Sequence, residues 1–452
     1  MTATPGSTPD RASFWEGIAV YFKPRVLVVM FLGFSAGLPL ALSGSTLLYW
    51  AAEVGVDLRK VGLFAWVASP YVFKFLWAPL VDALDVPVLS SLLGRRRAWL
   101  ILTQLLLIAS IVFLGFCDPL TAPELVALGA VIVATASATQ DIVIDTFRVE
   151  SLPDNEQAAG VASYVAAYRV GMLASGAGAL YVVSAFEAFG FTKQQGWTGS
   201  YIAMAALVVI GMVTTLLATE PERSKAAERA HSGVAPMQRL FTTVTGAFED
   251  FFLREGVLVA VMVMVFVILF KLTDALAGVM TGPFTQAIGV ARTDYANIIK
   301  GVGLAASLAG GFAGGYLARA VSLSTGLWIG GIVQALANFA FSWQAIVGHD
   351  LAWLTFAITV ENFTSAIGTV MFVAYLSALC RNPLHTATQY ALLTALSAVG
   401  RTFLAGGAGF LAFYTGWFWF FAICAFAGTP GLLLLAWLQW RGHFATLEFK
   451  RP

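Results

Sequence analysis

Charged residues are scarce in this chain. Asp, Glu, Lys and Arg make up 11% of its 452 residues, whereas soluble domains are usually about one quarter charged. The net charge is only +1, so the sequence gives no bulk basic signal for nucleic acid. Hydrophobic residues reach 59%, and a chain of this composition would expose too much apolar surface to remain in water. We therefore expect an all-α integral membrane protein embedded in the lipid bilayer.

Cysteine and histidine are also few. The three cysteines are odd in number and far apart, so they predict no disulfide framework: Cys117, Cys380 and Cys424. The four histidines are equally scattered, and we expect neither a metal nor a cofactor. A membrane enzyme would need nucleophile, base or metal ligands gathered at one membrane face, and no such cluster is visible. No cleavable signal peptide is evident, because the first hydrophobic segment is too long for a signal core.

Long apolar segments fill most of the sequence. Twelve membrane spans are expected, near residues 26–49, 61–83, 98–117, 124–147, 157–186, 198–218, 256–282, 294–318, 325–347, 350–380, 385–414 and 416–440. A polar stretch, "EPERSKAAERAHSGVAPMQRL", divides them into six and six. We expect a six-helix bundle over 1–218, a linker over 219–250 and a second six-helix bundle over 251–452.

Basic residues are distributed unequally between alternate loops. Most Lys and Arg residues of the predicted loops fall on the side of the N-terminus. Because cytoplasmic loops carry an excess of Lys and Arg, both termini and the linker are predicted to be cytoplasmic.

The two halves share a local pattern. "LASGAGAL" at 173–180 is similar to "LAGGAGFL" at 404–411, and each follows an arginine, Arg169 or Arg401. Small residues are common at membrane helix contacts, so chance similarity is an alternative. The matched fifth and eleventh spans favour an internal repeat. Two pseudo-symmetric six-helix bundles around a central site are the plan of major facilitator transporters.

Ionisable residues lie near the middle of several predicted spans. They are Lys74, Asp141, Arg169, Lys271, Asp274, Glu361 and Arg401. Each charge at a helix centre costs about 2.5–3.5 kcal/mol, so these side chains are expected to face a polar central cavity or to pair with one another. For Lys74, the alternative is a buried ion pair, for instance with Asp141, that only fixes helix packing.

The chemistry of these and neighbouring side chains indicates a substrate site and a proton site. Cations and neutral amides would bind an anionic solute: Lys74, Arg169, Lys271, Arg401, Gln140, Asn362 and Gln389. Tyr71 and Tyr168 would offer flat surfaces to sugar rings, with ordinary packing as the alternative. Because the chain has no ATP-binding loop, we expect Asp141 or Glu361, with Asp274 nearby, to couple transport to protons. Asp145 and Arg148 are expected to form gate or loop contacts.

A charged loop follows the second span. In "LVDALDVPVLSSLLGRRRAWL", Asp82 precedes Arg95, Arg96 and Arg97. Facilitator transporters carry an acidic–Gly–basic loop here that latches helix ends, which assigns a gating role to Asp82, Arg95 and Arg96. The segment between Asp82 and Gly94 is longer than in the common pattern, and an ordinary cytoplasmic basic cluster is the alternative.

Several strings together resemble one family of this superfamily, the AmpG-type muropeptide permeases: "LGFSAGLPLALSGSTLLYW", "YVFKFLWAPLVD", "GRRRAWL", "SATQDIVIDT", "ATQYALLTALSAVGR" and "PGLLLL". The resemblance implies a bacterial inner-membrane protein that imports GlcNAc–anhydro-MurNAc, with or without a stem peptide, using the proton gradient. Such import serves peptidoglycan recycling and influences β-lactamase induction, and thus antibiotic resistance. A monomer is expected.

Two other classes of function stay open. The first is a carrier of another bulky anion, such as an acyl-CoA or a nucleotide. The second is an integral-membrane enzyme or assembly factor; an assembly factor would not need charges at the centre of its spans.

Overall fold

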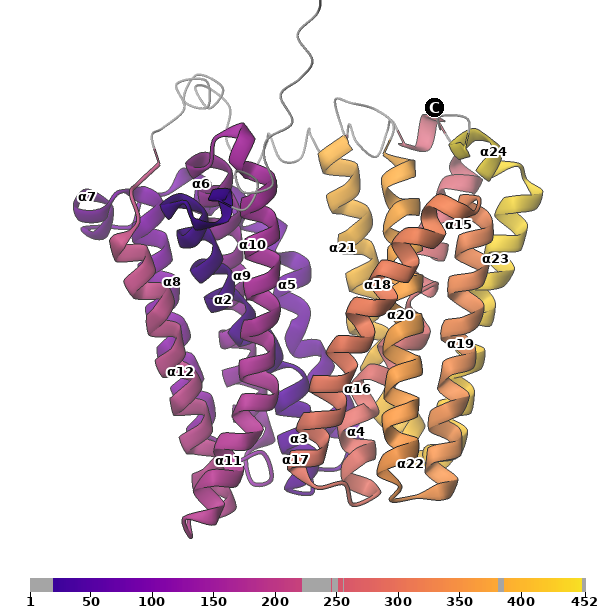
Figure 1. Ribbon diagram of the computed structural model, residues 1–452, viewed down its shortest axis with the longest axis horizontal. Coiled ribbons are helices and arrows are strands. Elements are labelled where there is room, and N and C mark those ends of the chain that lie inside the picture. The colour runs from indigo at the N-terminus through magenta and orange to yellow at the C-terminus, as the bar shows by residue number, and fades with distance from the viewer. Residues whose placement is uncertain (1–18, 222–244, 246–250, 255, 381–385, 449–452) are drawn as a thin grey trace, which may run out of the picture.

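The computed structural model describes residues 19–221, 245, 251–254, 256–380 and 386–448. Their long elements are all helices, and no β-strand occurs among them. Figure 1 shows two upright helical bundles side by side, the first from the N-terminal half and the second from the C-terminal half. Ten helical runs are long and apolar enough to cross a membrane, and two further crossings are made by broken helices.

The first bundle holds six crossings. They are α2 (Pro24–Ser43) with α3 (Ser45–Glu53); the broken run α4 (Leu58–Leu63), η2 (Phe64–Ala68), α5 (Ser69–Phe73), η3 (Lys74–Leu76) and α6 (Ala78–Ala83); α8 (Arg95–Phe116); α9 (Pro123–Ser151); α10 (Asp154–Leu173), η4 (Ala174–Gly178) and α11 (Ala179–Ala188); and α12 (Lys193–Leu217). The short α7 (Leu89–Leu93) lies between the second and third crossings.

The second bundle also holds six crossings. Its elements are α15 (Val257–Leu269) with α16 (Leu272–Ala287); α17 (Arg292–Tyr295), η5 (Ala296–Val302) and α18 (Gly303–Ala320); α19 (Leu323–Val347); α20 (Leu351–Leu379); α21 (Thr386–Ala405); α22 (Ala408–Ala427); α23 (Thr429–Trp440); and the short α24 (His443–Glu448). Gly416 has φ 74° and ψ 166° inside α22, so the eleventh crossing ends there and the twelfth begins.

The predicted fold class, an all-α membrane protein of twelve helices, is confirmed. Most span boundaries differ from the predicted ones by only a few residues. The fourth span is longer than expected: α9 continues to Ser151, so Arg148, which lies just beyond the predicted span, is on the same helix as Asp145. The predicted linker, 219–250, lies mostly outside the described residues.

The two bundles meet at one end of the molecule and diverge toward the other (Figure 1). We call the end where α2 begins and α24 lies the terminal end, and the opposite end the distal end. At the distal end α3 contacts α16, α4 contacts α22 and α11 contacts α17. One hydrophobic cluster there includes Trp50 from the first half and Phe284 from the second. Toward the terminal end, each half has its own cluster, with Phe147 in the first and Phe266 in the second.

Close packing of α2 on α10 depends on glycine. A methyl group added to Gly37 would lie 2.1 Å from the carbonyl oxygen of Tyr168, and one added to Gly171 would lie 2.3 Å from that of Phe34. Backbone atoms cannot move away as a flexible side chain can, so these two helices approach closely only because both positions lack a Cβ.

Replacing Gly37 with alanine is expected to lower the stability of the first bundle by about 1–3 kcal/mol, the usual cost of overpacking. The midpoint of thermal unfolding of the purified protein in detergent would report it. Gly311→Ala is the matched control, because Gly311 lies inside α18 and a Cβ there has no neighbour within 4 Å. Equal midpoints for the two variants would contradict the packing argument.

Candidate functional site

The first polar cluster surrounds Lys74, where the second crossing is broken at η3. The Nζ atom of Lys74 lies 3.9 Å from Oδ2 of Asp141, and the two side chains are 34% and 11% exposed. The ion pair with Asp141, given above as the alternative for Lys74, therefore exists, but it is long. Oδ1 of Asp141 is buried and has no hydrogen-bond partner in the described part of the chain. The ammonium group of Lys74 thus keeps N–H donors for a solute.

Tyrosines and an amide lie around this pair. Tyr71 and Tyr168 are both close enough to Asp141 to interact with it electrostatically, and both are half-buried. Gln140 is fully buried, and neither of its amide atoms has a hydrogen-bond partner among the described residues. In this conformation the structure brings Tyr71, Tyr168 and Asp141 together, whereas Gln140 does not face open space.

Arg169 lies on α10, seven residues before Gly176. At Gly176 the side chain of Lys300 from the second bundle packs against the backbone. Arg169 is exposed, as is Arg401 on α21. Neither arginine has an ion-pair partner in the parts of the chain that are described. Both stay candidates for binding an anion.

The second polar cluster forms where α15 ends and α16 begins. The Nζ atom of Lys271 donates to Oδ2 of Asp274 at 2.6 Å and to Oγ1 of Thr369 at 2.9 Å. Oδ2 of Asp274 also accepts a hydrogen bond from Ser365 at 2.5 Å. Lys271 is only 8% exposed, so its donors serve the protein itself in this conformation. Its predicted contact with a solute requires another state.

Glu361 lies one turn before Ser365 on α20. Its Oε2 accepts a hydrogen bond from Nδ2 of Asn362 at 2.7 Å, and Oδ1 of Asn362 accepts one from Ser307 at 3.1 Å. Lys271 and Asp274 lie close enough to act on Glu361 electrostatically. The structure therefore joins the predicted residues Lys271, Asp274, Glu361 and Asn362 in one cluster, while Gln389, on α21, is buried at 3% exposure.

The predicted gating residues lie at the terminal end of the first bundle. The guanidinium group of Arg96 pairs with Glu150 of α9 at 2.8 Å and is almost fully buried. The carboxylate of Glu220 accepts hydrogen bonds from the backbone N–H groups of Arg96 and Arg97 and so caps the start of α8. These bonds tie α8 to its own bundle.

The remaining gating predictions have different outcomes. The side chain of Asp82 lies outside the described part of the structure, so its latch with the arginines stays a prediction. Arg95 is the first residue of α8. Asp145 and Arg148 form an ion pair of 3.5 Å along α9, and the guanidinium group of Arg148 lies over the ring of Tyr164.

An ion cluster at the distal end was not anticipated from the sequence. Arg292, at the start of α17, bonds Glu53 of α3 at 2.7 Å and Glu187 of α11 at 2.8 Å. Trp197 donates to the second oxygen of Glu53 at 2.8 Å. We call Arg292, Glu53 and Glu187 the distal clasp, because it joins the two halves. Each member lies at a span end, where charges are ordinary, and only the fold brings them together.

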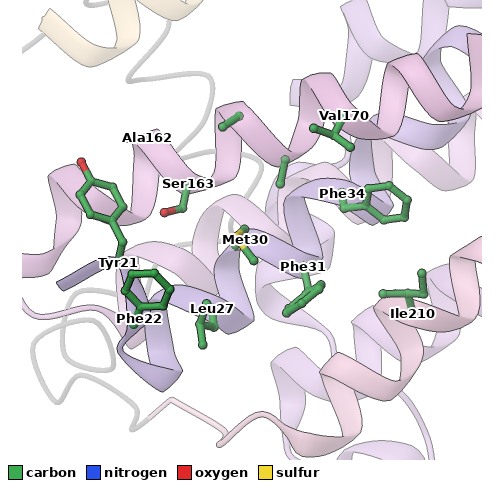
Figure 2. A pocket seen from close by; sticks show the side chains of 12 residues that line it. Tyr21, Phe22, Leu27, Met30, Phe31, Phe34, Ala162, Ser163, Val170 and Ile210 are labelled. Atoms are coloured by element: carbon green, nitrogen blue, oxygen red, sulfur yellow. The ribbon is translucent and has the colours of Figure 1, made fainter. Parts of the chain in front are cut away.

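A groove of about 740 Å³ lies between α2, α10 and α12. Figure 2 shows Phe31, Phe34, Val170 and Ile210 around it. Its lining holds no charged side chain, so it offers no site for an anion and fits the acyl chain of a lipid better.

Two six-helix bundles that meet at one end, with ionised side chains at mid-depth in each, define a membrane transporter of the major facilitator type rather than an enzyme. The model of the Major Facilitator Superfamily matches residues 29–345. The chain belongs to this superfamily and, within it, to the AmpG-type muropeptide permeases.

The relatives support both levels of this assignment. The chain is 38% identical to the anhydromuropeptide permease of Escherichia coli strain K12 over 435 residues, which cover 96% of this chain and 82% of the relative. It is 34% identical to a putative transporter AmpG 4 of Rickettsia conorii, over 92% of this chain and 96% of that one. A solved nucleoside transporter, NupG, superposes with a TM-score of 0.63 at 14% identity, covering 94% of this chain and 100% of the other; this likeness concerns the fold alone.

Proposed function

We propose that this protein imports anhydromuropeptides, GlcNAc–anhydro-MurNAc with or without a stem peptide, across the bacterial inner membrane for peptidoglycan recycling. The relative that is 38% identical over 96% of the chain is an anhydromuropeptide permease. These solutes are bulky anions that carry sugar rings and carboxylates. The observation that carries the proposal is the partly exposed Lys74 at mid-depth, whose long ion pair leaves donors for a carboxylate.

The same proposal orients the molecule. The excess of basic residues on the side of the termini supports a cytoplasmic location for the terminal end. The bundles meet at the distal end, which would then face the periplasm. The structure would then be the inward-facing state of a carrier. The distal clasp would hold this state. We expect this carrier to act as a monomer.

Proton coupling is assigned to the second cluster. It contains one cation, Lys271, and two carboxylates, Asp274 and Glu361. Because Lys271 already neutralises Asp274, a proton on Glu361 would make the cluster neutral. In the first bundle, Lys74 and Arg148 balance Asp141 and Asp145, so no added proton is needed there. Charge balance thus favours Glu361 as the residue that binds the transported proton.

Uptake of labelled GlcNAc–anhydro-MurNAc into vesicles, with and without a pH gradient, tests the proposal. Lys74→Ala is expected to reduce uptake at least about tenfold, since a charge-assisted hydrogen bond is lost from the site. Lys60→Ala is the matched control, because Lys60 belongs to the same crossing but is exposed at its distal end.

Each other outcome removes a defined part of the proposal. Uptake that ignores the pH gradient would exclude proton coupling and leave the carrier. Absence of uptake by the unaltered protein, together with uptake of a labelled acyl-CoA or nucleotide, would replace the solute by another bulky anion.

A further inference from the structure

A lysine without a carboxylate partner lies between the two bundles, near their closed end. Lys300 belongs to η5 in the eighth crossing. Its Nζ donates to Oγ of Ser45 in the first bundle at 2.7 Å and lies 5.7 Å from the centre of the Tyr295 ring. No ion pair to Lys300 occurs in the described parts of the chain. The sequence did not single it out, because it lies near the end of a predicted span.

The carboxylates of the distal clasp are paired with another cation. Glu53 and Glu187 both bind Arg292, which precedes Lys300 by about two turns, or roughly 12 Å along the helix. The clasp keeps one net negative charge, because one guanidinium group faces two carboxylates, but neither carboxylate forms an ion pair with Lys300 among the described residues. A hydrogen bond to a serine alone could be made by a neutral side chain at far lower desolvation cost, so linking the helices does not explain a cation here.

Three helices are irregular where they meet this side chain. The first crossing breaks at Gly44, directly before Ser45, with φ −105° and ψ −108°. The fifth crossing is π-helical over Ala174–Gly178, and the eighth is π-helical over Ala296–Val302. A Cβ on Gly176 would lie 3.4 Å from Cδ of Lys300. Short π-helical segments within α-helices are frequent at functional sites, and here one of them holds Lys300 while the other packs against its side chain.

The side chain of Lys300 is also accessible to a solute. It keeps part of its surface exposed, and it packs against Gly176 of the fifth crossing, the crossing that also carries Arg169 closer to the terminal end. About seven residues separate Gly176 from Arg169, which corresponds to roughly 10 Å along the helix. The two cations thus follow one interface at two depths, with Lys300 the deeper.

We infer that Lys300 binds a carboxylate of the transported solute between the two bundles, near the distal end where they meet. Its ammonium group would exchange the hydrogen bond with Ser45 for one to the anion. This inference rests on the proposed function and adds a binding residue to it. Arg169 would hold a second anionic group of a longer solute about 10 Å away. A solute with separated carboxylates would then contact both bundles and bring them together.

The test compares two probes, the free acid GlcNAc–anhydro-MurNAc and its carboxamide, by binding to the purified full-length protein. The unaltered protein is expected to bind the acid about 10- to 100-fold more tightly than the amide, the range of one charge-assisted hydrogen bond. Lys300→Met should bring the two affinities within about twofold while leaving that of the amide unchanged. Lys193→Met, at an exposed lysine that begins α12, should keep the preference for the acid.

A second variant separates binding from a packing role. Ser45→Ala removes the described hydrogen-bond partner of Lys300, so the preference for the acid should rise severalfold. Lys300 would have no part in binding if Lys300→Met kept the preference, if it weakened both probes equally, or if Ser45→Ala left the ratio unchanged. If the unaltered protein bound neither probe, the proposed function would fail, and this inference with it.

Discussion

Replacing Arg292 with glutamine is expected to open the distal end of the carrier and to reduce uptake at least about tenfold. The side chains of Arg292 and Glu53 are each 9% exposed. Removing one partner of a buried ion pair costs about 3–5 kcal/mol, and here two carboxylates would be left facing each other. That energy is sufficient to shift a two-state equilibrium by more than about a hundredfold.

Spin labels at two exposed positions, Thr121 in the first half and His349 in the second, would measure the opening. Both lie in connections at the distal end, and the distance between them should increase in Arg292→Gln. Glu53→Gln should act more strongly than Glu187→Gln, because the Glu187 side chain is 33% exposed and better solvated. Glu124→Gln, at an exposed acid on the same end, should change nothing. An unaltered distance distribution in Arg292→Gln would show that the clasp does not hold the closed end.

Replacing Glu361 with glutamine is expected to reduce solute accumulation driven by a pH gradient at least about tenfold. Exchange of labelled for unlabelled solute across the membrane should continue. Glutamine resembles the protonated carboxyl group in shape and keeps a hydrogen-bond acceptor for Asn362. The cluster with Lys271 and Asp274 would then stay neutral throughout the cycle, so no proton would need to bind or leave. Measuring accumulation and exchange in the same vesicles separates coupling from binding.

Asp141→Asn supplies the comparison. Asp141 is the partner of Lys74, so its loss is expected to change the affinity for the solute while the dependence on the pH gradient remains. If Asp141→Asn lost the gradient dependence and Glu361→Gln kept it, the coupling residue would lie in the first bundle. If both variants kept full gradient-driven uptake, neither carboxylate would carry the proton.

Much of the fold follows from hydropathy, because a membrane leaves few choices. A helix that must cross the hydrocarbon core needs about 20 apolar residues and satisfies its own backbone hydrogen bonds. The predicted spans 98–117 and 325–347 accordingly correspond to Arg95–Phe116 and Leu323–Val347. Hydropathy does not report helix breaks. Two pieces of the irregular second crossing, α5 and α6, have a proline in their first turn, Pro70 and Pro79, whereas the π-helical segments carry no such residue signal.

The candidate site was predicted in part for the same reason. Depth in a span identified Lys74, Asp141 and Glu361, since a charge at mid-span is costly wherever its helix lies. Depth could not distinguish Lys271, whose donors are used by Asp274 and Thr369, from Lys74, whose donors stay partly free. Arg292, Glu53 and Lys300 were not predicted, because charges near span ends are common.

The amino-acid sequence alone determined that this chain spans a membrane twelve times, which family it resembles and which charges lie deep, because the cost of placing a group in hydrocarbon depends on that group and its depth. Only the tertiary structure decided which charges are neutralised and which remain free. Ion pairing depends on a few ångströms between helices that are far apart in sequence: Glu53 lies 239 residues from Arg292, and Ser45 lies 255 residues from Lys300.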